Sequence, residues 1–401
     1  MSKLTKYKFS DLYRMSSGIS STKEQAGHGS PFLSFSVVFN NYFVPDVLSD
    51  LMDTSEKEKE TYSIKCGDIF LTRTSEVIDE LAMSCVAVKD YPNATFSGFL
   101  KRLRPTQNNI TYPKFMAFYL RSPMFRKTMT NNAVMTLRAS LNEAIFSYLE
   151  LLLPAYSEQK KAGDLLYLLN QKIALNNRIN AELEAMAKTL YDYWFVQFDF
   201  PDANGKPYKT SGGKMEYNAT LKRKIPADWE VCSINDILGK IPSSTKITSK
   251  DVMMSGRYPV IDQSQNYICG FTDEKDAVIK PDCAHVVFGD HTRIVKLVNF
   301  CYARGADGTQ VLLSESKRMP VYLLYQVVSN IDLSNYGYAR HYKFLKEEKV
   351  ILPHENIARE YQVFANACYE RIRSNIFESI ELETFRDWLL PLLMNGQVTI
   401  K

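Results

Sequence analysis

The pattern of apolar and polar residues along the chain contains two long helical stretches, one in the middle and one near the C-terminus. In residues 153–195, apolar side chains recur at intervals of three and four, the spacing of one face of an α-helix. Residues 352–390 repeat this spacing in a less apolar form. Each stretch follows a segment of different character, and this alternation indicates an internal duplication.

The two segments that precede the helices, residues 1–152 and 226–351, have the pattern of mixed α/β domains. In the first, short apolar runs such as CGDIFLT and CVAV precede FMAFYLRSPMF, which has helical spacing. In the second, YPVI, AHVVF and TQVLL read as strands and VYLLYQVVSNI as a helix. The predicted fold class is therefore α/β (α+β), with two mixed domains in tandem and a pseudo-two-fold repeat.

Short matches between the two halves support the duplication. The first variable segment contains Ser20-Ser21-Thr22-Lys23 and Ser30-Pro31-Phe32-Leu33, which we align with Ser243-Ser244-Thr245-Lys246 and Tyr258-Pro259-Val260-Ile261. Identical residues also align in the two helices: Pro154 with Pro353, Ile173 with Ile372, Asn176 with Asn375, and Asp192 with Asp387. The predicted domains are 1–152, the helical region 153–200, a polar linker 201–225, 226–351, and the second helical region 352–401.

The two helices are predicted to pack on each other as an antiparallel coiled coil, since neither seam is apolar enough to be stable alone. The first seam consists of Leu165, Leu169, Lys172, Asn176, Ile179, Leu183, Met186, Leu190 and Tyr193. The second consists of Tyr361, Ala365, Cys368, Ile372, Asn375, Ser379, Leu382, Arg386 and Leu389. Asn176 and Asn375 either fix the register as buried amides or are solvated at a bend. Trp194 and Trp388 are expected either to lock the helix ends onto a domain or to be exposed anchors for another subunit.

Composition narrows the class of protein. The 401 residues are 45% hydrophobic, enough to bury several cores, and the net charge of +4 by itself indicates nothing about nucleic acid. Seven cysteines without a CxxC pair favour reduced thiols in a cytosol. With no apolar N-terminal region and no long apolar run, we expect a cytoplasmic protein that has no contact with a membrane.

Three sequence segments resemble the specificity (S) subunits of type I restriction-modification systems. The run LLLPAYSEQKKAGDLLYLLNQKIALNNRINAELEAMAKTLYDYWFVQF, at 151–198, is similar to their central conserved region. LRASLN at 137–142 and GDIFLTRTSE at 67–76 are similar to the sequence leading into it. The resemblance extends over the whole chain, although Glu158-Gln159 has no clear counterpart in the C-terminal copy.

The resemblance implies a non-catalytic protein that binds double-stranded DNA in a bacterial or archaeal cytoplasm. Each variable segment would be a target recognition domain for one half of a bipartite, asymmetric site, and the helices would set the spacer between the halves. Two methyltransferase (M) subunits would dock on the helices, and restriction motor-nuclease (R) subunits would join them. S-adenosylmethionine, ATP and Mg²⁺ would be used by those partners, and no cofactor is expected in this chain, which shows no Walker A or NPPY/DPPY motif.

Side chains able to bond to bases or phosphates follow several predicted strands. In the first domain the candidates are Arg73, Thr74, Ser75, Lys101, Arg102 and Arg104. In the second they are Gln263, Ser264, Gln265, Asn266, His291, Thr292, Arg293 and Lys296. Arg138 and Arg340, shortly before the helices, are candidates either for phosphate contacts or for salt bridges to a helix. We expect roughly half of the candidates to contact DNA, most of them at phosphates.

Other kinds of site and function fit less well. Cys283, His285, Asp290 and His291 have a spacing that suits no standard zinc site, so no metal is expected. Asp202 to Lys206 resembles a nuclease motif only loosely and lacks its second acidic group. Two alternative functions remain: the recognition portion of a split restriction-methylation enzyme, and a helical scaffold without a nucleic-acid role, which would show no salt-dependent DNA binding.

Overall fold

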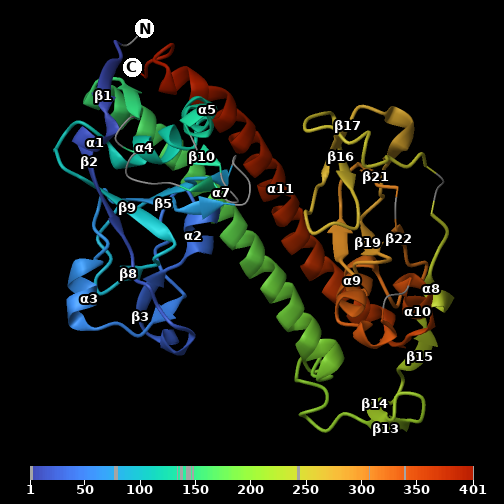
Figure 1. Ribbon diagram of the computed structural model, residues 1–401. Coiled ribbons are helices and arrows are strands. Elements are labelled where there is room, and N and C mark those ends of the chain that lie inside the picture. The colour runs from blue at the N-terminus through green and yellow to red at the C-terminus, as the bar shows by residue number, and fades with distance from the viewer. Residues whose placement is uncertain are drawn as a thin grey trace. The chain divides into compact units, whose positions relative to one another are not determined.

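The computed structural model describes residues 3–75, 80–132, 134–135, 139–140, 146, 149–241, 244–306, 308–337 and 340–400. The chain divides into two compact units. Unit 1 comprises Met1–Ala174 and Glu378–Lys401, and unit 2 comprises Leu175–Phe377. Each unit combines helices with small sheets (Figure 1), which confirms the predicted fold class.

The main sheet of unit 1 is antiparallel and has the strand order β2-β9-β5-β7. Its inner strand β5 (Ile69–Thr72) is buried along its whole length, as the apolar run IFLT predicts. Helix α4 (Pro113–Tyr119) begins with a proline at its first position, where a missing N–H costs nothing. Its Phe115 and Phe118 are fully buried in a core that also contains Leu389 and Leu393 of the C-terminal helix.

The remaining elements of unit 1 form smaller sheets and short helices. The strands are β1 (Thr5–Lys8), β2 (Tyr13–Ser17), β3 (Ala26–Leu33), β4 (Leu51–Met52), β6 (Thr74–Ser75), β7 (Ser84–Val86), β8 (Thr95–Phe96), β9 (Leu100–Pro105), β10 (Val134–Met135), β11 (Ala139–Ser140) and β12 (Glu150–Leu153). The helices are α1 (Phe9–Leu12), η1 (Lys23–Gln25), α2 (Phe35–Asn40), α3 (Glu56–Thr61) and α5 (Pro123–Asn132).

The larger sheets of unit 2 have the strand orders β20-β19-β22 and β17-β16-β21-β18, and β13 pairs with β14 and β15 with β23 in two-stranded sheets. Its strands are β13 (Met215–Asn218), β14 (Arg223–Pro226), β15 (Glu230–Ser233), β16 (Tyr258–Ile261), β17 (Gly270–Thr272), β18 (Val278–Ile279), β19 (His285–Gly289), β20 (Val295–Val298), β21 (Tyr302–Arg304), β22 (Thr309–Leu312) and β23 (Lys349–Leu352). Its shorter helices are η3 (Asp192–Val196), α8 (Ile234–Ile237), η4 (Lys275–Ala277), α9 (Val321–Ser329), η5 (Ser334–Tyr336) and α10 (His341–Glu347).

The strand registers of the two units correspond and confirm part of the predicted repeat. Leu33 pairs in parallel with Phe96, and Ile261 pairs in parallel with Arg304, so the SPFL and YPVI segments are equivalent. In each unit the strand that precedes a long helix pairs with a strand near the start of that unit's variable segment, β1 with β12 and β15 with β23. Duplication of one α+β module accounts for both registers.

The predicted match between the two SSTK segments is wrong. The backbone N–H of Ile19 donates to the carbonyl of Phe96, and that of Ile247 donates to the carbonyl of Arg304. Since Phe96 and Arg304 are equivalent, Ile19 corresponds to Ile247. The first SSTK segment follows Ile19, whereas the second precedes Ile247, and so these segments occupy different places in the fold.

The long helices, α7 (Tyr156–Tyr191) and α11 (Glu355–Met394), run antiparallel where they pack together. In unit 2 the Tyr361 hydroxyl donates to the carbonyl of Ala187, while further along the pair Asn176 contacts Asn375. All nine predicted seam residues of α11 are buried or half-buried. The antiparallel pairing of these helices is therefore confirmed.

The predicted seam of α7 is only partly right. Asn176 is buried and Leu169, Ile179, Leu183 and Leu190 are half-buried, but Met186 and Tyr193 are 52% and 38% exposed. At several of the seam positions the buried side chain is instead the next residue along the chain, as at Leu166, Ile173 and Ala187. The small Ala187 is buried where the Tyr361 hydroxyl bonds to its carbonyl, and the larger, adjacent Met186 is exposed.

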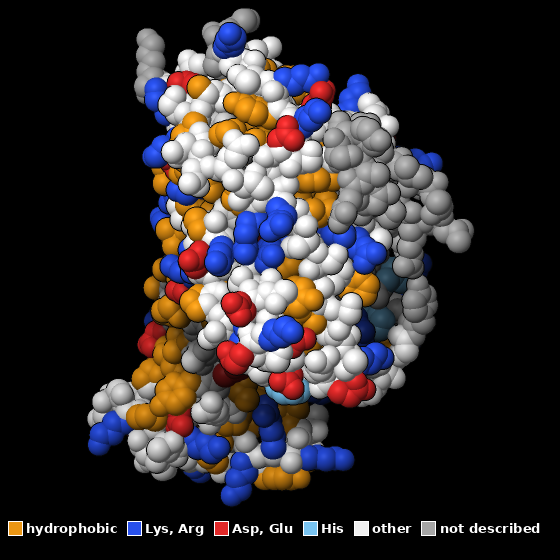
Figure 2. Space-filling model, turned by 60° about the vertical axis from the view of Figure 1, so that its left-hand side comes forward, with side chains coloured by type: hydrophobic (Ala, Val, Ile, Leu, Met, Phe, Trp, Pro, Cys, Tyr) orange, Lys and Arg blue, Asp and Glu red, His pale blue; other side chains and the backbone are white. Residues whose placement is uncertain are grey.

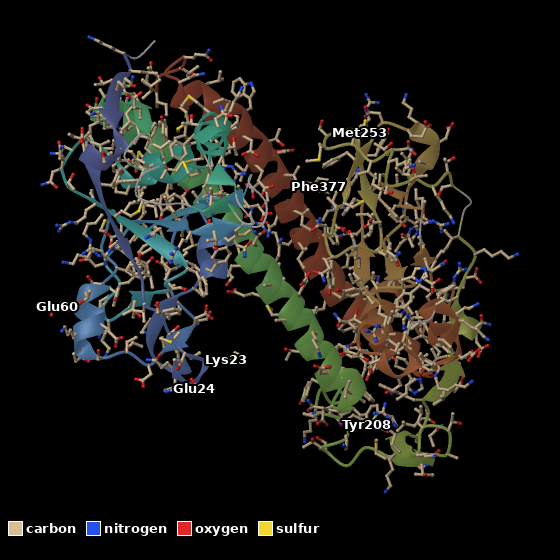
Figure 3. All side chains as sticks on the ribbon, viewed as in Figure 1. Lys23, Glu24, Glu60, Tyr208, Met253 and Phe377 are labelled. Atoms are coloured by element: carbon tan, nitrogen blue, oxygen red, sulfur yellow. The ribbon has the colours of Figure 1, made fainter. Side chains whose placement is uncertain are left out.

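Residues 201–225, predicted as a linker, contain part of an ordered structure. They include β13 and most of β14, which pair as a hairpin. The ring of Phe200 stacks on Tyr208, labelled in Figure 3, at 4.6 Å and on Trp229 at 4.9 Å. These aromatic contacts fix the segment to the core of unit 2.

Candidate nucleic-acid interface

Two of the predicted contact sets occupy equivalent places in the two units. Thr72, the last residue of β5, pairs with Leu100 at the start of β9. Gly289, the last residue of β19, pairs with Thr309 at the start of β22. The segments Arg73–Ser75 and 290–293 therefore leave equivalent strand ends, although their sequences, RTS and DHTR, differ.

The exposure of these side chains fits a binding surface. Arg73 is exposed and Thr74 is half-buried, and Ser75 is the last residue of β6. His291, Thr292 and Arg293 are all exposed at the turn between β19 and β20. Arg293 has a φ of +62°, in the left-handed region, which gives this turn a sharp reversal.

In unit 2 the structure brings two predicted contact sets together. The side-chain oxygen of Gln263 accepts a hydrogen bond from the backbone N–H of His291 at 3.1 Å. The Thr292 hydroxyl donates to the carbonyl of Gln263 at 2.7 Å. We call residues 262–266 and 290–293 the polar loop cluster. Gln265 and Asn266 are exposed within it, and Ser264 is half-buried and donates to the Asp262 carboxylate at 2.6 Å.

Arg340 belongs beside this cluster. It is exposed and directly precedes His341, whose backbone N–H donates to the carbonyl of Asp290 at 2.9 Å. The backbone N–H of Tyr342 donates to the Asp290 carboxylate at 2.8 Å. The sequence suggested a clamp near the second helix, whereas the structure places Arg340 next to the turn that carries His291 to Arg293. Arg138, the residue predicted at the corresponding position of the first domain, lies outside the described residues.

Lys296 has a different environment from the one predicted. Its side chain is only 4% exposed, and its ammonium group donates to the carbonyls of Asp262 and Asn266 at 2.8 and 2.5 Å. Burial lowers the pKa of Lys296, and the nearby Asp262 carboxylate acts in the opposite sense. These contacts engage the ammonium group inside the protein, so Lys296 is not available for direct contact with DNA.

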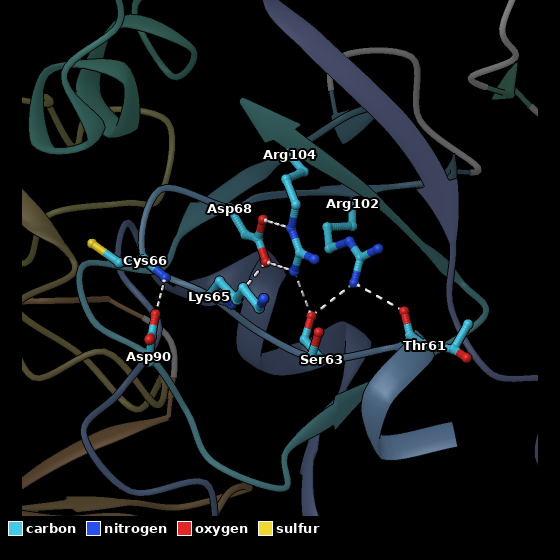
Figure 4. Close-up of polar contacts among 8 residues, drawn as sticks. All are labelled: Thr61, Ser63, Lys65, Cys66, Asp68, Asp90, Arg102 and Arg104. Carbon is cyan, nitrogen blue, oxygen red and sulfur yellow. Dashed lines mark hydrogen bonds and ion pairs between the residues drawn. The ribbon is translucent and has the colours of Figure 1, made fainter. Parts of the chain in front are cut away.

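Arg102 is buried and Arg104 is half-buried, and both donate hydrogen bonds to groups inside the protein (Figure 4). The Arg102 side chain is largely buried and donates to the carbonyls of Ser63 and Thr61 at 2.7 and 3.4 Å. Arg104 forms two hydrogen bonds with the buried Asp68 carboxylate, at 2.8 and 2.6 Å, and a third with the Ser63 carbonyl. Burial lowers the pKa of Arg102, while the bond to Asp68 raises that of Arg104.

The basic cluster in unit 1 is therefore mainly structural. Arg102 and Arg104 secure the segment that leads from α3 into β5, and their guanidinium groups are engaged within the protein. Lys101 is half-buried, and its ammonium group lies 2.8 Å from the Ser17 hydroxyl. It remains a candidate because part of its side chain reaches solvent.

Phe99 is a surface residue that the sequence reading did not single out. Its side chain is 67% exposed, and its carbonyl accepts a hydrogen bond from the backbone N–H of Arg73 at 2.9 Å. An exposed apolar ring beside an arginine that is a candidate DNA contact could pack against the methyl group of thymine in the major groove. The only signal in the sequence is a phenylalanine in the glycine-containing loop FSGF, which is also common in buried turns.

The surface charge is distributed in small groups. On the face shown in Figure 2, Lys and Arg side chains alternate with Asp and Glu rather than forming one continuous basic surface. Among the described residues, no group of three or more His, Cys, Asp or Glu side chains could hold a metal ion. The ring nitrogen Nδ1 of His285 lies 3.1 Å from the Tyr302 hydroxyl. Within the part of the chain that the structure describes, no helix is long and apolar enough to span a membrane.

The long helices carry exposed apolar side chains at equivalent positions. Phe385 follows Met186 by 199 residues, the same interval that separates Asn375 from Asn176. Met186 lines a pocket of unit 2 with Thr189, Tyr193 and Phe364, and Phe385 lines a pocket of unit 1 with Ile380, Thr384 and Trp388. Trp388 is 62% exposed, so it does not lock a helix end, and its exposure fits the alternative of an anchor; Trp194 is half-buried against the core of unit 2.

Comparison with known proteins gives consistent results. Residues 2–185 match the family described as type I restriction modification DNA specificity domain. The chain is 20% identical over 359 residues to the type I restriction enzyme MjaIX specificity subunit of Methanocaldococcus jannaschii, covering 84% of this chain and 78% of that protein. It is 26% identical over 222 residues to the HindI specificity subunit of Haemophilus influenzae, covering 55% and 44%.

One solved structure supports the fold over almost the whole length. The type I restriction-modification system S subunit from M. genitalium is similar with a TM-score of 0.62 at 13% identity. The similarity covers 98% of this chain and 96% of that one.

Proposed function

We propose that the chain is a type I restriction modification DNA specificity protein, the family that residues 2–185 match, and that it reads a bipartite, asymmetric DNA sequence, one half with each unit. The observation that carries this proposal is the pair of equivalent strand ends that present Arg73 in unit 1 and His291 to Arg293 in unit 2. A duplicated module whose equivalent loops differ in sequence suits a target with two different halves. As a non-catalytic subunit, it would direct methylation or cleavage by partners.

The long helices suit a role as spacer between the two half-sites. Helix α7 contains 36 residues and begins in unit 1 and ends in unit 2. At 1.5 Å per residue it is about 54 Å long, which exceeds one turn of DNA of roughly 34 Å. A continuous helix of this length would fix the number of unread base pairs between the half-sites.

The equivalent apolar patches around Met186 and Phe385 suit two copies of one partner. Exposed apolar side chains gathered at a pocket favour a protein contact over free solvent. The partner proposed for these patches is the methyltransferase subunit, with the motor-nuclease subunits joining the assembly. S-adenosylmethionine, ATP and Mg²⁺ would then be bound by these partners in the cytoplasm of the cell.

Mapping methylated bases tests the proposal. A cell carrying this chain and its methyltransferase partner should show methylation at one bipartite motif. Replacing residues 1–145 with those of a relative should change one half of the motif and leave the other half unchanged. A change in both halves would contradict recognition by separate units, and a protein without salt-dependent DNA binding would favour the helical scaffold.

A further inference from the structure

We propose that Lys296 is a positioning residue for base recognition, because its buried ammonium group holds the polar loop cluster of unit 2 in one conformation. The proposal rests on the proposed function and goes beyond it by assigning how the second half-site is read. Lys296 would act through main-chain atoms, and the exposed side chains of residues 265–266 and 291–293 would contact the DNA.

The position of Lys296 explains how one side chain can hold a whole loop. It lies on β20 directly opposite Val287 of the inner strand β19. Its ammonium group donates to the carbonyls of Asp262 and Asn266, the two ends of the loop that follows β16. The Asp262 carboxylate lies 3.6 Å away and balances the buried charge. One ammonium group therefore bonds to both ends of this loop.

Gln263 joins this loop to the neighbouring turn. Besides its bonds to His291 and Thr292, Gln263 is tightly packed against Gly289, the last residue of β19, and Gly308, which directly precedes β22. A Cβ added at Gly289 would lie 2.9 Å from the Cβ of Gln263, and one at Gly308 would lie 2.6 Å from its side-chain amide nitrogen. Movement of Gln263 would thus disturb the loop and the turn together.

The turn is also held from its other side. The carbonyl and carboxylate of Asp290 accept the backbone N–H groups of His341 and Tyr342 at the start of α10. Asp290 itself is buried, whereas His291, Thr292 and Arg293 are exposed. The cluster therefore has a buried, hydrogen-bonded base and an exposed polar surface, an arrangement that limits the entropy lost on binding.

A positioning residue and a phosphate-binding residue leave different traces in binding data. Loss of a lysine bound to phosphate weakens binding to all sequences and reduces the salt slope by about one. Loss of Lys296 as a positioning residue should instead reduce discrimination at the half-site of unit 2 and leave the salt slope unchanged. Discrimination at the half-site of unit 1 should also be unchanged.

The experiment uses the full chain assembled with its methyltransferase partner. Affinities are measured at several salt concentrations for the cognate duplex and for duplexes with single base changes in either half-site. Lys296→Met is expected to lower discrimination in one half-site by roughly tenfold. Lys214→Met is the control, since Lys214 is an exposed lysine of the same unit that pairs with Glu216 in the predicted linker segment.

Gln263→Leu provides a second variant that does not remove a buried charge. It should lower discrimination in the same half-site, since it loses the bond to His291. Circular dichroism first establishes that each variant is folded, and Gln263→Leu decides the question where Lys296→Met does not fold. Unchanged discrimination, an equal loss in both half-sites, or a reduced salt slope would each overturn the proposal. A wild-type complex that shows no sequence preference would instead overturn the proposed function.

Discussion

The side-chain amide of Asn176 lies 3.5 Å from the main-chain carbonyl of Asn375, to which it donates a hydrogen bond, and both residues are buried. The Asn375 amide in turn donates to the side-chain oxygen of Asn180 at 2.8 Å. Asn375 is the residue that aligns with Asn176 in the second copy of the helix. The repeated helices thus meet at their own equivalent position, and the alternative of solvated amides at a bend is wrong.

Replacing Asn375 by alanine should destabilise unit 2. The substitution removes the hydrogen bond to Asn180 and leaves a small void in the seam, which together cost about 1–2 kcal/mol of unfolding free energy. Denaturant unfolding of the full chain measures this loss. Asn177→Ala, at an exposed position of α7, is the matched control and should change stability by less than about 0.5 kcal/mol.

Inserting four residues into α7 between Ala181 and Ala187 should lengthen the spacer of the methylated motif. Four residues add about 6 Å to the helix, which corresponds to roughly one or two base pairs. Methylation mapping should show the longer spacer with both half-sites as before. Altered half-sites at an unchanged spacer would mean that α7 does not set the distance.

Arg73 and Arg102 should respond to substitution in opposite ways. Arg73→Ala removes an exposed side chain and should weaken DNA binding by roughly tenfold without changing the melting temperature. Arg102→Met removes buried hydrogen bonds to two carbonyls and should cost about 2–3 kcal/mol of stability. DNA affinity and stability are measured for both variants, so that each variant is the control for the other. Reversed effects would exchange the roles assigned to these arginines.

The apolar patches on the long helices should be required for assembly with the methyltransferase partner. Met186→Glu and Phe385→Glu each place a charge in one patch, and each single variant should bind one partner fewer than the wild type. The double variant should bind none, while its helical content stays normal. Analytical ultracentrifugation of the mixed components gives the stoichiometry. Wild-type stoichiometry in the double variant would place the partner elsewhere.

The stability of unit 1 should fall in acid through Asp164. Burial opposes ionisation of this carboxyl group, but hydrogen bonds from Tyr112, Lys114 and Lys160 outweigh it and lower its pKa to about 2. A lowered pKa in the folded state stabilises the protein above the unfolded value near 4, and this stabilisation is lost as the pH falls from about 4 to 2.

Asp164→Asn tests this assignment. The variant should lose about 1 kcal/mol at neutral pH, a modest amount because the group is partly exposed and screened by solvent. Its melting temperature should depend less on pH between about 4 and 2 than that of the wild type. Identical pH profiles for the two proteins would remove Asp164 from the account of acid stability.

The sequence predicted those features that depend on local periodicity and composition. The two α+β modules, the antiparallel helices and the whole seam of α11 could be identified, because apolar spacing reports which face of a helix is covered. The seam of α7 was partly misassigned, since Met186 and Tyr193 are apolar yet exposed. Their hydrophobicity reflects a surface patch, and periodicity alone cannot separate a patch from a core.

Long-range hydrogen bonds had no comparable signal. Arg102, Arg104 and Lys296 looked like surface cations, and only the folded chain shows the carbonyls and the carboxylate that surround them. Gln159 appeared to have no counterpart in the second repeat. In the structure its side chain accepts the N–H of Tyr112, and Gln362 accepts the N–H of Tyr322 in the same way, although it stands one helical turn later in its helix.

The bonds that Lys296 makes to the polar loop cluster involve main-chain oxygens at both ends of the loop. A carbonyl group is the same whichever side chain its residue carries. The intervening side chains of Ser264 and Gln265 can therefore be exchanged without loss of the lysine contacts. Under the proposed function, exchange of these side chains would change the target sequence without a change in the surrounding structure.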